Sequence, residues 1–463
     1  MIAPTNFRKL TFCLTLLILF SSCKKWVQGP PPDTLITDEK VFADDNTAQD
    51  AVIGMYTQAM NTSLSYANGG ISLYAGLSAD ELTASTVIGN EDAFTRNAIG
   101  STNPIIADLY GAAYNIILNA NTVIQGVAGS KGMTAAKKAQ FTGEAKFMRA
   151  LVYFYQVNLW GPVPLITQTD PEITSLQPRA AVDIVYDTII SDLVDAKSLL
   201  PSAYPTKAGY EQDRTRPNSS AAAALLSRVY LFRGRWAEAE NEANFVIQDS
   251  RYKLEPLLDS VFLEHSHEAI FQLQPVYSNQ ATAEGYIFNP YVGNRPSYPL
   301  RPELMAAWEV GDQRKIQWTQ GVTAFGTDYV FPCKYKQRTY TPLSPEYNMV
   351  IRLAETYLIR AEAKAQQGNL SGGVADLNVV RHRAGLPTTT AITASTLLTA
   401  IYHERQVELF TEWGHRWLDL KRTNRADSIL GAEKPGWTST AALFPIPQYD
   451  IETNPNLTQN PGY

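Results

Sequence analysis

The stretch Ala221–Ile247, AAAALLSRVYLFRGRWAEAENEANFVI, has the clearest helical pattern in this chain. Apolar residues recur at the spacing of one helix face, first before Gly234 and again after it. They are Ala222, Leu225, Leu226, Val229 and Tyr230, followed by Trp236, Ala239, Ala243, Val246 and Ile247. The small side chains at Ala239 and Ala243 allow two helices to approach closely. The stretch therefore predicts a helix, a tight glycine turn and a second helix that returns antiparallel to the first.

The spacing within this hairpin resembles one tetratricopeptide (TPR) unit. The positions at which that repeat uses Leu, Tyr, Gly, an aromatic residue and Ala are occupied here by Leu226, Tyr230, Gly234, Trp236 and Ala239. An ordinary helical hairpin is the alternative. Both interpretations describe a scaffold, and neither identifies a ligand. A second hairpin is expected at 350–383 around Gly368, too distant from the first for neighbouring repeats of thirty-odd residues.

The rest of the chain alternates between helical and irregular patterns. Further helices are expected at 48–59, 105–127, 144–159, 182–200 and 397–421. Long irregular segments are expected at 61–103, around Gly69-Gly70, and at 252–345, where Ala269–Leu273 is a candidate strand. The Pro- and Asn-rich tail 443–463 is not expected to be helical. The pattern predicts a mainly α fold of TPR-like helix pairs with long irregular loops and a little β structure.

The N-terminus has the pattern of a secretory leader. Arg8 and Lys9 precede the apolar segment Leu10–Phe20, which is too short to span a bilayer. Ser21-Ser22-Cys23 then resembles a bacterial lipobox, with Phe20 in place of the usual Leu. We expect residues 1–22 to be a lipoprotein signal peptide and Cys23 to be the lipidation site. A soluble secreted protein with an incidental Cys23 is the alternative.

The cysteine count agrees with lipid anchoring. The chain has three cysteines, Cys13, Cys23 and Cys333, and the first would leave with the leader. If Cys23 carries acyl chains, Cys333 has no partner for an internal disulfide. Acyl chains on Cys23 would anchor the protein without a membrane-spanning helix. Residues 23–36, which include three consecutive prolines at 30–32, are then expected to be a stiff tether.

Composition excludes several classes of protein. Hydrophobic residues make up 45% of the 463 residues, so the chain can bury a substantial core. Its formal net charge is -6, and it contains no basic run that would bind nucleic acid. We also find no HExxH, EF-hand, GxSxG or phosphate-binding glycine loop. We therefore predict no cofactor. No motif in the sequence supports an enzymatic function.

The densest charge cluster lies at 401–422. Glu404, Glu408 and Glu412 are four residues apart, which would place them on one face of a helix. One interpretation is a carboxylate pair that acts as the acid and base of a glycosidase. The other is structural, with Arg405–Glu408 and Glu412–Arg416 as ion pairs within the helix. We favour the structural interpretation.

The pair of histidines in His265-Ser266-His267-Glu268 raises the possibility of a metal site. The i, i+2 spacing suits neither one helix face nor a common zinc motif, so we favour an ordinary loop. The sequence does not specify any metal. We therefore predict no metal ligands, and we predict no catalytic residues.

Tyrosine and tryptophan are concentrated in the irregular segments. Sugars pack their flat CH faces on such rings, while amides and carboxylates bind their hydroxyls. Most of these rings could instead simply pack the loops against the core. The rings in question are Tyr66, Tyr74, Tyr291, Tyr298, Trp318, Tyr329 and Tyr340. As candidate ligand-binding residues we select Tyr74, Tyr291, Tyr298, Trp318 and Tyr329.

Several segments spread over the chain resemble the SusD/RagB family, the surface nutrient-binding lipoproteins of the Bacteroidota. The N-terminal matches are Ser21-Ser22-Cys23, 144–150 (EAKFMRA), 160–164 (WGPVP) and the hairpin with Gly234 and Trp236. The C-terminal matches are 352–363, 377–385, the charged residues of 404–422 and the tail with 444–447 (FPIP), 454–457 (NPNL) and 459–463 (QNPGY).

This resemblance implies a single SusD-like domain of four TPR-like helix pairs that carry an irregular ligand-binding region. We expect its N-terminal half at 37–250 and its SusD/RagB C-terminal half, with the binding region, at 251–463. It also implies a non-enzymatic role in the cell outer membrane: capture of an oligosaccharide or other nutrient and delivery to a SusC-like TonB-dependent transporter. Display toward the exterior rests on the resemblance, because Lys24-Lys25-Trp26 is not the acidic run often linked to surface export. The alternative is a TPR-like envelope protein that binds another protein, and a lipid-anchored glycoside hydrolase is a more distant one.

Overall fold

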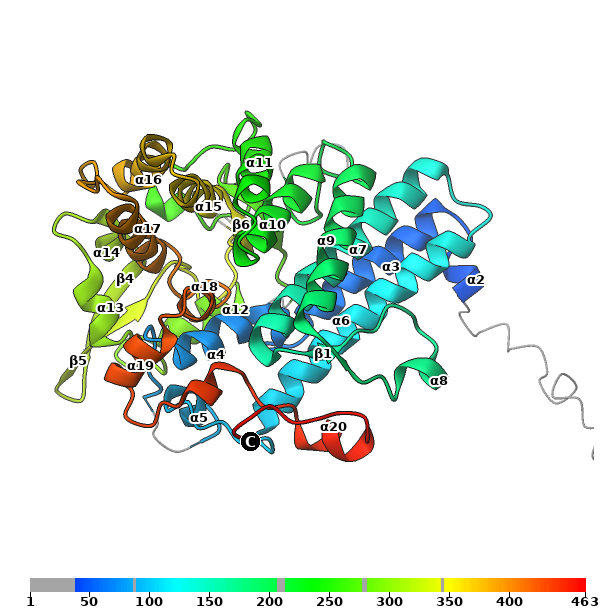
Figure 1. Cartoon of the computed structure of the whole chain (residues 1–463), viewed down its shortest axis with the longest axis horizontal. Helices are drawn as coiled ribbons and strands as arrows, with labels where there is room; N and C mark the ends of the chain where they lie inside the picture. The colour runs from blue at the N-terminus through cyan, green and yellow to red at the C-terminus, as the bar shows by residue number, and fades with distance from the viewer. Residues whose placement is uncertain (1–37, 86–88, 206–212, 277–280, 343–344) are drawn as a thin grey trace, which may run out of the picture.

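The computed structural model describes residues 38–85, 89–205, 213–276, 281–342 and 345–463. The expected leader, the tether and Cys23 lie outside the described residues. Within them the molecule is built from helices packed side by side, with three small two-stranded sheets (Figure 1). Its main hydrophobic core includes residues from Phe42 to Leu457, so both ends of the described chain contribute to it.

The N-terminal half consists of long amphipathic helices that begin at well-formed caps. The Asp44 carboxylate accepts hydrogen bonds from the backbone N–H groups of Asn46 and Thr47, and Asn103 caps the next long helix at Ile105 N–H. These helices are α2 (Asp38–Val41), α3 (Asp45–Met60), α6 (Pro104–Gly129), α7 (Ala135–Trp160) and α9 (Val182–Leu199). The expected helices at 48–59, 105–127, 144–159 and 182–200 are confirmed.

The helical hairpin expected at 221–247 is confirmed. Helix α10 (Ser219–Phe232) and helix α11 (Trp236–Ile247) are joined by Gly234, whose φ of 66° suits glycine. A second hairpin, α15 (Leu353–Gln366) and α16 (Leu370–Arg383), turns at Gly368 with φ 83°. Although about a hundred residues separate them in sequence, α11 packs against α15. The two hairpins are therefore neighbours in space, which the sequence spacing did not suggest.

The expected helix at 397–421 is wrong, because the chain breaks in its middle. Helix α17 (Ala394–Glu408) ends before a turn in which Thr411, Trp413 and Gly414 have positive φ, and α18 (His415–Arg422) follows. The turn allows the Trp413 backbone N–H to donate to Ser72 Oγ at 3.0 Å. It thereby joins the C-terminal half to the N-terminal half.

The strands are short and antiparallel. The candidate strand 269–273 is confirmed as β3, fully buried against β6. The three pairs are β1 (Val163–Pro164) with β2 (Arg179–Ala180), β3 (Ala269–Leu273) with β6 (Asn348–Arg352), and β4 (Thr319–Ala324) with β5 (Thr327–Pro332). The remaining short helices between 252 and 345 are η3 (Leu258–Ser260), α12 (Ala283–Phe288), α13 (Pro302–Ala307) and α14 (Gln313–Trp318).

Two segments are more helical than expected. The segment 61–103 contains a π-helical turn and two helices, and the tail contains a short helix where none was expected. They are η2 (Tyr66–Gly70), α4 (Ile71–Ser78) and α5 (Asp92–Thr95), and in the tail α20 (Gln448–Thr453). All eight residues of α4 are buried, so it has no polar face and no amphipathic period for the sequence to show. The other short helices are α8 (Pro171–Thr174), α19 (Ala426–Glu433) and η4 (Ser439–Ala442).

The C-terminal tail is bound to the end of α7. The indole N–H of Trp160 donates to Pro445 O at 2.9 Å, and the Asn460 side-chain amide donates to Trp160 O at 2.9 Å. These contacts join two of the sequence segments that carried the family resemblance.

Candidate functional site

A surface pocket of about 450 Å³ lies between the turn after α3, helix α4 and the first half of α6. We call it the α4–α6 pocket; α4 and α6 are neighbours in the lower half of Figure 1. Its lining combines amides and hydroxyls with one tyrosine ring and one carboxylate. The lining residues are Gln58, Ala59, Asn61, Thr62, Ser63, Leu64, Ser65, Tyr74, Ile105, Ala107, Asp108, Gly111, Ala112, Asn115 and Ile116.

The turn 61–65 that walls the pocket is held by backbone geometry. Leu64 has a positive φ of 62°, and its N–H donates to Asn68 O at 2.9 Å. The Asn68 amide donates in turn to Met60 O at 3.0 Å. A Cβ on Gly70 would lie 2.5 Å from Ser65 O, so only glycine allows the chain to approach this closely. The pocket wall is therefore preformed in the fold.

Tyr74 places an aromatic ring at the pocket from the otherwise buried helix α4. Its ring packs 4.9 Å from that of Phe94, and only 5% of the residue is exposed. Burial raises the pKa of Tyr74, and Tyr298, Glu91 and Asp108 raise it further. Burial likewise raises the pKa of Tyr298 to about 12, with Glu91 adding to the shift. Both hydroxyls remain protonated at neutral pH and can donate hydrogen bonds.

A second aromatic feature lies near α12. The Arg338 guanidinium stacks between the Tyr286 ring, 4.2 Å away, and the Tyr291 ring, 4.0 Å away. One guanidinium nitrogen of Arg338 donates to the backbone carbonyls of Tyr286 and Asn289, which fixes the stack. Tyr291 is 60% exposed, so it presents an anchored ring to solvent.

The structure separates the five candidate aromatic residues. Tyr74 lines the pocket, and Tyr298 is close enough to affect the Tyr74 hydroxyl. Tyr291 belongs to the stack with Arg338, and Tyr329 is a half-buried residue of β5 that does not line the pocket. Trp318 is fully buried, and its indole N–H donates to Leu258 O at 3.0 Å. Trp318 packs the core here, and its selection is corrected.

Tyr66 and Tyr340, the two other aromatic residues of the irregular segments, differ in exposure. Tyr66 is buried, and its hydroxyl donates to Val152 O at 2.9 Å. Tyr340 is 45% exposed.

Sequence reasoning missed Asp108 and Asn115, because they are exposed residues on an amphipathic helix and resemble an ordinary solvated face. Their position beside the 61–65 turn is a tertiary feature with no local signal.

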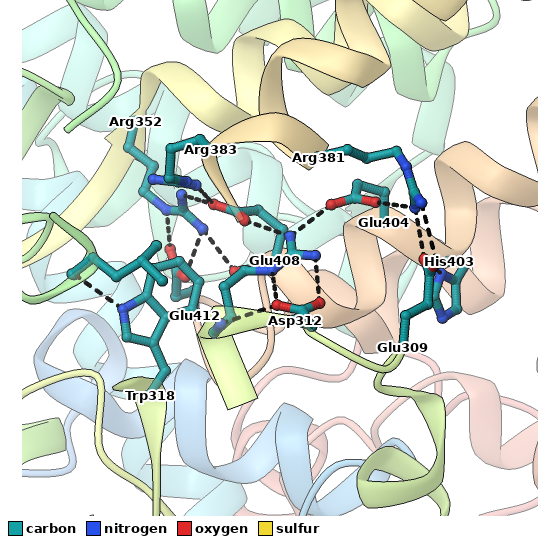
Figure 2. Close-up of polar contacts among 12 residues, drawn as sticks. Glu309, Asp312, Trp318, Arg352, Arg381, Arg383, His403, Glu404, Glu408 and Glu412 are labelled. Atoms are coloured by element: carbon teal, nitrogen blue, oxygen red, sulfur yellow. Dashed lines mark hydrogen bonds and ion pairs between the residues drawn. The ribbon is translucent and has the colours of Figure 1, made fainter. Parts of the chain in front are cut away.

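Glu404, Glu408 and Glu412 belong to a buried ion-pair network (Figure 2). Arg352 lies at its centre and contacts Glu268 at 2.8 Å, Glu408 at 2.5 Å and Glu412 at 2.7 Å. Burial opposes ionisation of Glu408, yet Arg383, Arg352 and Arg314 hold its pKa well below the usual value. A carboxylate neutralised in this way is a poor proton donor or acceptor. The structural interpretation is supported.

The expected ion pairs within one helix are wrong in detail. Arg405 contacts Asp419 at 2.7 Å rather than Glu408, and Arg416 contacts Asp80 at 2.5 Å rather than Glu412. The break after α17 redirects these side chains, because an i, i+4 pair requires a continuous helix. The network connects separate elements instead of bracing one.

The histidine segment lies in a loop, as expected. His267 contacts Glu255 at 3.0 Å. His265 lies 3.9 Å from Asp213 and 3.7 Å from Glu264, but through different ring nitrogens. Asp213, Glu264 and His265 nonetheless each offer one ligand atom, and these atoms lie within 4.8 Å of one another, so the three residues are a candidate metal-binding group among the described residues. Cys333 is a buried free thiol whose nearest polar partner is Gln320 Oε1 at 3.7 Å.

Among the described helices, none combines the length and hydrophobicity needed to cross a bilayer. The fold combines antiparallel helix pairs with an open pocket of amides, hydroxyls and one tyrosine ring. Residues 39–231 match a family model described as starch-binding and associating with the outer membrane, and residues 309–463 match the model of the SusD family. The chain belongs to the SusD/RagB family.

Relatives span nearly the whole chain. SusD-like protein P25 of Formosa agariphila is 26% identical over 97% of this chain and 98% of its own length. The fold is similar to the crystal structure of a SusD superfamily protein from Bacteroides vulgatus, with a TM-score of 0.80, 22% identity and coverage of 91% and 99%. A laminarin-binding SusD-like protein matches with a TM-score of 0.77, 26% identity and coverage of 90% and 99%. Proteins of this family are associated with the outer membrane and bind carbohydrate.

Proposed function

We propose that this protein is a non-catalytic receptor that captures an oligosaccharide in the α4–α6 pocket. The observation that carries the proposal is the pocket itself: a preformed surface hollow with a tyrosine ring beside amides and hydroxyls. Such a lining matches the alternating CH faces and hydroxyls of a sugar. The laminarin-binding relative supports a glycan as the ligand.

The aromatic residues divide between two roles in this proposal. Tyr74 contributes ring surface and a protonated hydroxyl at the pocket, and Tyr298 lies close enough to affect that hydroxyl. Tyr291, stacked on Arg338, offers an exposed ring on which a longer glycan could rest. An anchored ring loses little conformational entropy on binding, which favours such a contact.

Calorimetric titration of the full-length protein in detergent against a glycan panel tests the proposal. The panel includes β-1,3-, β-1,4- and α-1,4-linked glucose oligomers, β-1,4-mannan and β-1,4-xylan oligomers. Saturable binding of at least one oligomer, with no reducing ends released over a day, is expected. Release of reducing ends would contradict a non-catalytic role. Absence of binding to every glycan, together with a stable complex with another envelope protein, would favour the protein-binding alternative.

We further propose that Cys23 carries a lipid anchor to the outer membrane and that the domain delivers its ligand to a SusC-like TonB-dependent transporter. The family resemblance and the model for outer-membrane association support this part. Affinity purification from mildly solubilised native membranes should recover such a transporter in about equal amount. Recovery of the protein alone, under conditions that preserve other membrane complexes, would contradict the partnership.

A further inference from the structure

The lining of the α4–α6 pocket contains one acidic residue and no basic one. Asp108 is an exposed residue of α6 within the lining, and none of the lining residues is Lys or Arg. Glu91 precedes α5 and does not line the pocket, but it lies close enough to affect Tyr74 and Tyr298. Within the described parts of the chain, neither carboxylate forms an ion pair. Among the described residues, no basic side chain therefore pairs with their negative charge.

The same carboxylates also affect the hydroxyls of Tyr74 and Tyr298. After burial, Tyr298, Glu91 and Asp108 raise the pKa of Tyr74, and Glu91 raises that of Tyr298. No Lys or Arg in the described part of the chain opposes either shift. Nearby negative charge therefore adds to the effect of burial at both hydroxyls.

Two arginines of neighbouring segments, Arg96 and Arg338, are already engaged. Arg96 contacts Asp92 at 2.5 Å at the end of α5. Arg338 is stacked between Tyr286 and Tyr291 and donates to backbone carbonyls. A ligand carboxylate or sulfate would thus lose water without gaining a cationic partner at the pocket, and an unpaired charge transferred in this way is unfavourable.

We infer that the pocket selects uncharged oligosaccharides and that Asp108 and Glu91 exclude glycans bearing uronic acid or sulfate groups. The inference rests on the proposed glycan-binding function and narrows its substrate class. Amides and neutral hydroxyls remain able to bind sugar hydroxyls, whereas each acidic group of a ligand meets like charge. The net charge of the chain, -6, acts in the same direction at long range.

The test compares the neutral oligomers of the same panel with a hexamer of galacturonic acid. The variant is Asp108→Asn with Glu91→Gln. The matched control is Glu172→Gln with Asp187→Asn, which removes two exposed carboxylates from α8 and α9, away from the pocket lining. Calorimetry at low and high salt gives the ratio of the dissociation constant for the acidic hexamer to that for the best neutral hexamer.

We expect wild type to bind a neutral hexamer and to bind the acidic hexamer at least about tenfold more weakly at low salt. The pocket variant should lower the ratio by about tenfold, and the control should leave it within about twofold. High salt should reduce the difference between wild type and the variant.

Two results would overturn the inference while the proposed function stands. One is wild type that binds the acidic hexamer as tightly as the neutral ones. The other is a pocket variant whose ratio is unchanged or that still shows no acidic binding, because the carboxylates would then not be the excluding groups. Wild type that binds no glycan of either class would contradict the proposed function itself.

Discussion

Arg352 illustrates how this molecule uses charge in its interior. Its guanidinium is 2% exposed and contacts three buried carboxylates, Glu268, Glu408 and Glu412 (Figure 2). These carboxylates come from the loop before β3, from the end of α17 and from the turn before α18. The network therefore holds distant segments in one arrangement, on which the elements around it depend.

Replacing Arg352 with Met should strongly destabilise the protein. The change leaves buried carboxylates without a central partner, which costs about 3–5 kcal/mol. Urea unfolding followed by circular dichroism measures the change. The matched control is Arg235→Met, since Arg235 forms an exposed pair with Glu238 and should contribute less than about 1 kcal/mol. Equal effects of the two substitutions would contradict a structural role for the network.

His415 should make stability depend on pH. Burial lowers the pKa of His415 to about 4, with Arg228 and Arg405 adding to the shift and Glu355 opposing it. The unfolded chain takes up a proton near pH 6.5, whereas the folded chain does so only near pH 4. This contribution is complete above pH 6.5 and is lost as the pH falls toward 4.

The His415→Gln variant isolates this contribution. Between pH 7.5 and 4.5, wild type should lose about 2–3 kcal/mol more unfolding free energy than the variant. Urea midpoints at several pH values, with the slope of each transition, provide the measurement. Parallel curves for the two proteins would show that His415 is not held neutral by burial.

For single residues, the sequence shows which aromatic side chains lie in irregular segments, but it does not show whether each one packs in the core or lines a pocket. Trp318 and Tyr74 both looked like loop aromatics, yet one fills the core and the other lines a pocket. The difference depends on α4, which carries Tyr74 and is covered on all sides by other elements. No local pattern reports such long-range packing, so the site had to come from the structure.

The pocket depends on one element, the turn between α3 and α4. A Cβ on Gly70 would lie 2.5 Å from Ser65 O and 2.6 Å from Leu64 O. Gly70→Ala should therefore destabilise the protein by about 1–3 kcal/mol and weaken glycan binding, because the turn that walls the pocket must shift. Thermal unfolding and calorimetric titration of the same sample measure both effects.

Gly54 provides the matched control for this substitution. It lies in α3, and a Cβ there would meet no atom within 4 Å. Gly54→Ala should stabilise the protein by about 0.5–1 kcal/mol through helix propensity and leave binding unchanged. A stable, fully binding Gly70→Ala variant would disprove the role of the turn.

Elements with an amphipathic face were predictable, and those without one were not. The hairpins around Gly234 and Gly368 follow from periodicity and glycine punctuation. Helix α4 was not predicted because it is buried throughout. The break after α17 was not predicted because Glu404, Glu408 and Glu412 fit one continuous helical period. In each case tertiary contacts overrode the local pattern.

The whole molecule is expected to be held at the membrane by its lipid rather than by a helix. Cys23→Ala should move the protein from the membrane fraction to the soluble fraction, because the acylation site is lost. Fractionation after carbonate extraction, with immunoblotting, gives the distribution. Cys333→Ala serves as the control and should remain with the membrane. Membrane retention of the Cys23 variant would contradict lipid anchoring.

Glycan binding in the α4–α6 pocket can be tested by a substitution that fills the pocket without disturbing the fold. Gly111 lines the α4–α6 pocket from α6, and a Cβ there meets no atom within 4 Å. Gly111→Trp should occupy the pocket and weaken oligosaccharide binding at least about tenfold, whereas Gly111→Ala should bind like wild type. Calorimetry of both variants, with unfolding curves to confirm that they are folded, provides the test. A folded Gly111→Trp variant with wild-type affinity would show that the glycan binds elsewhere.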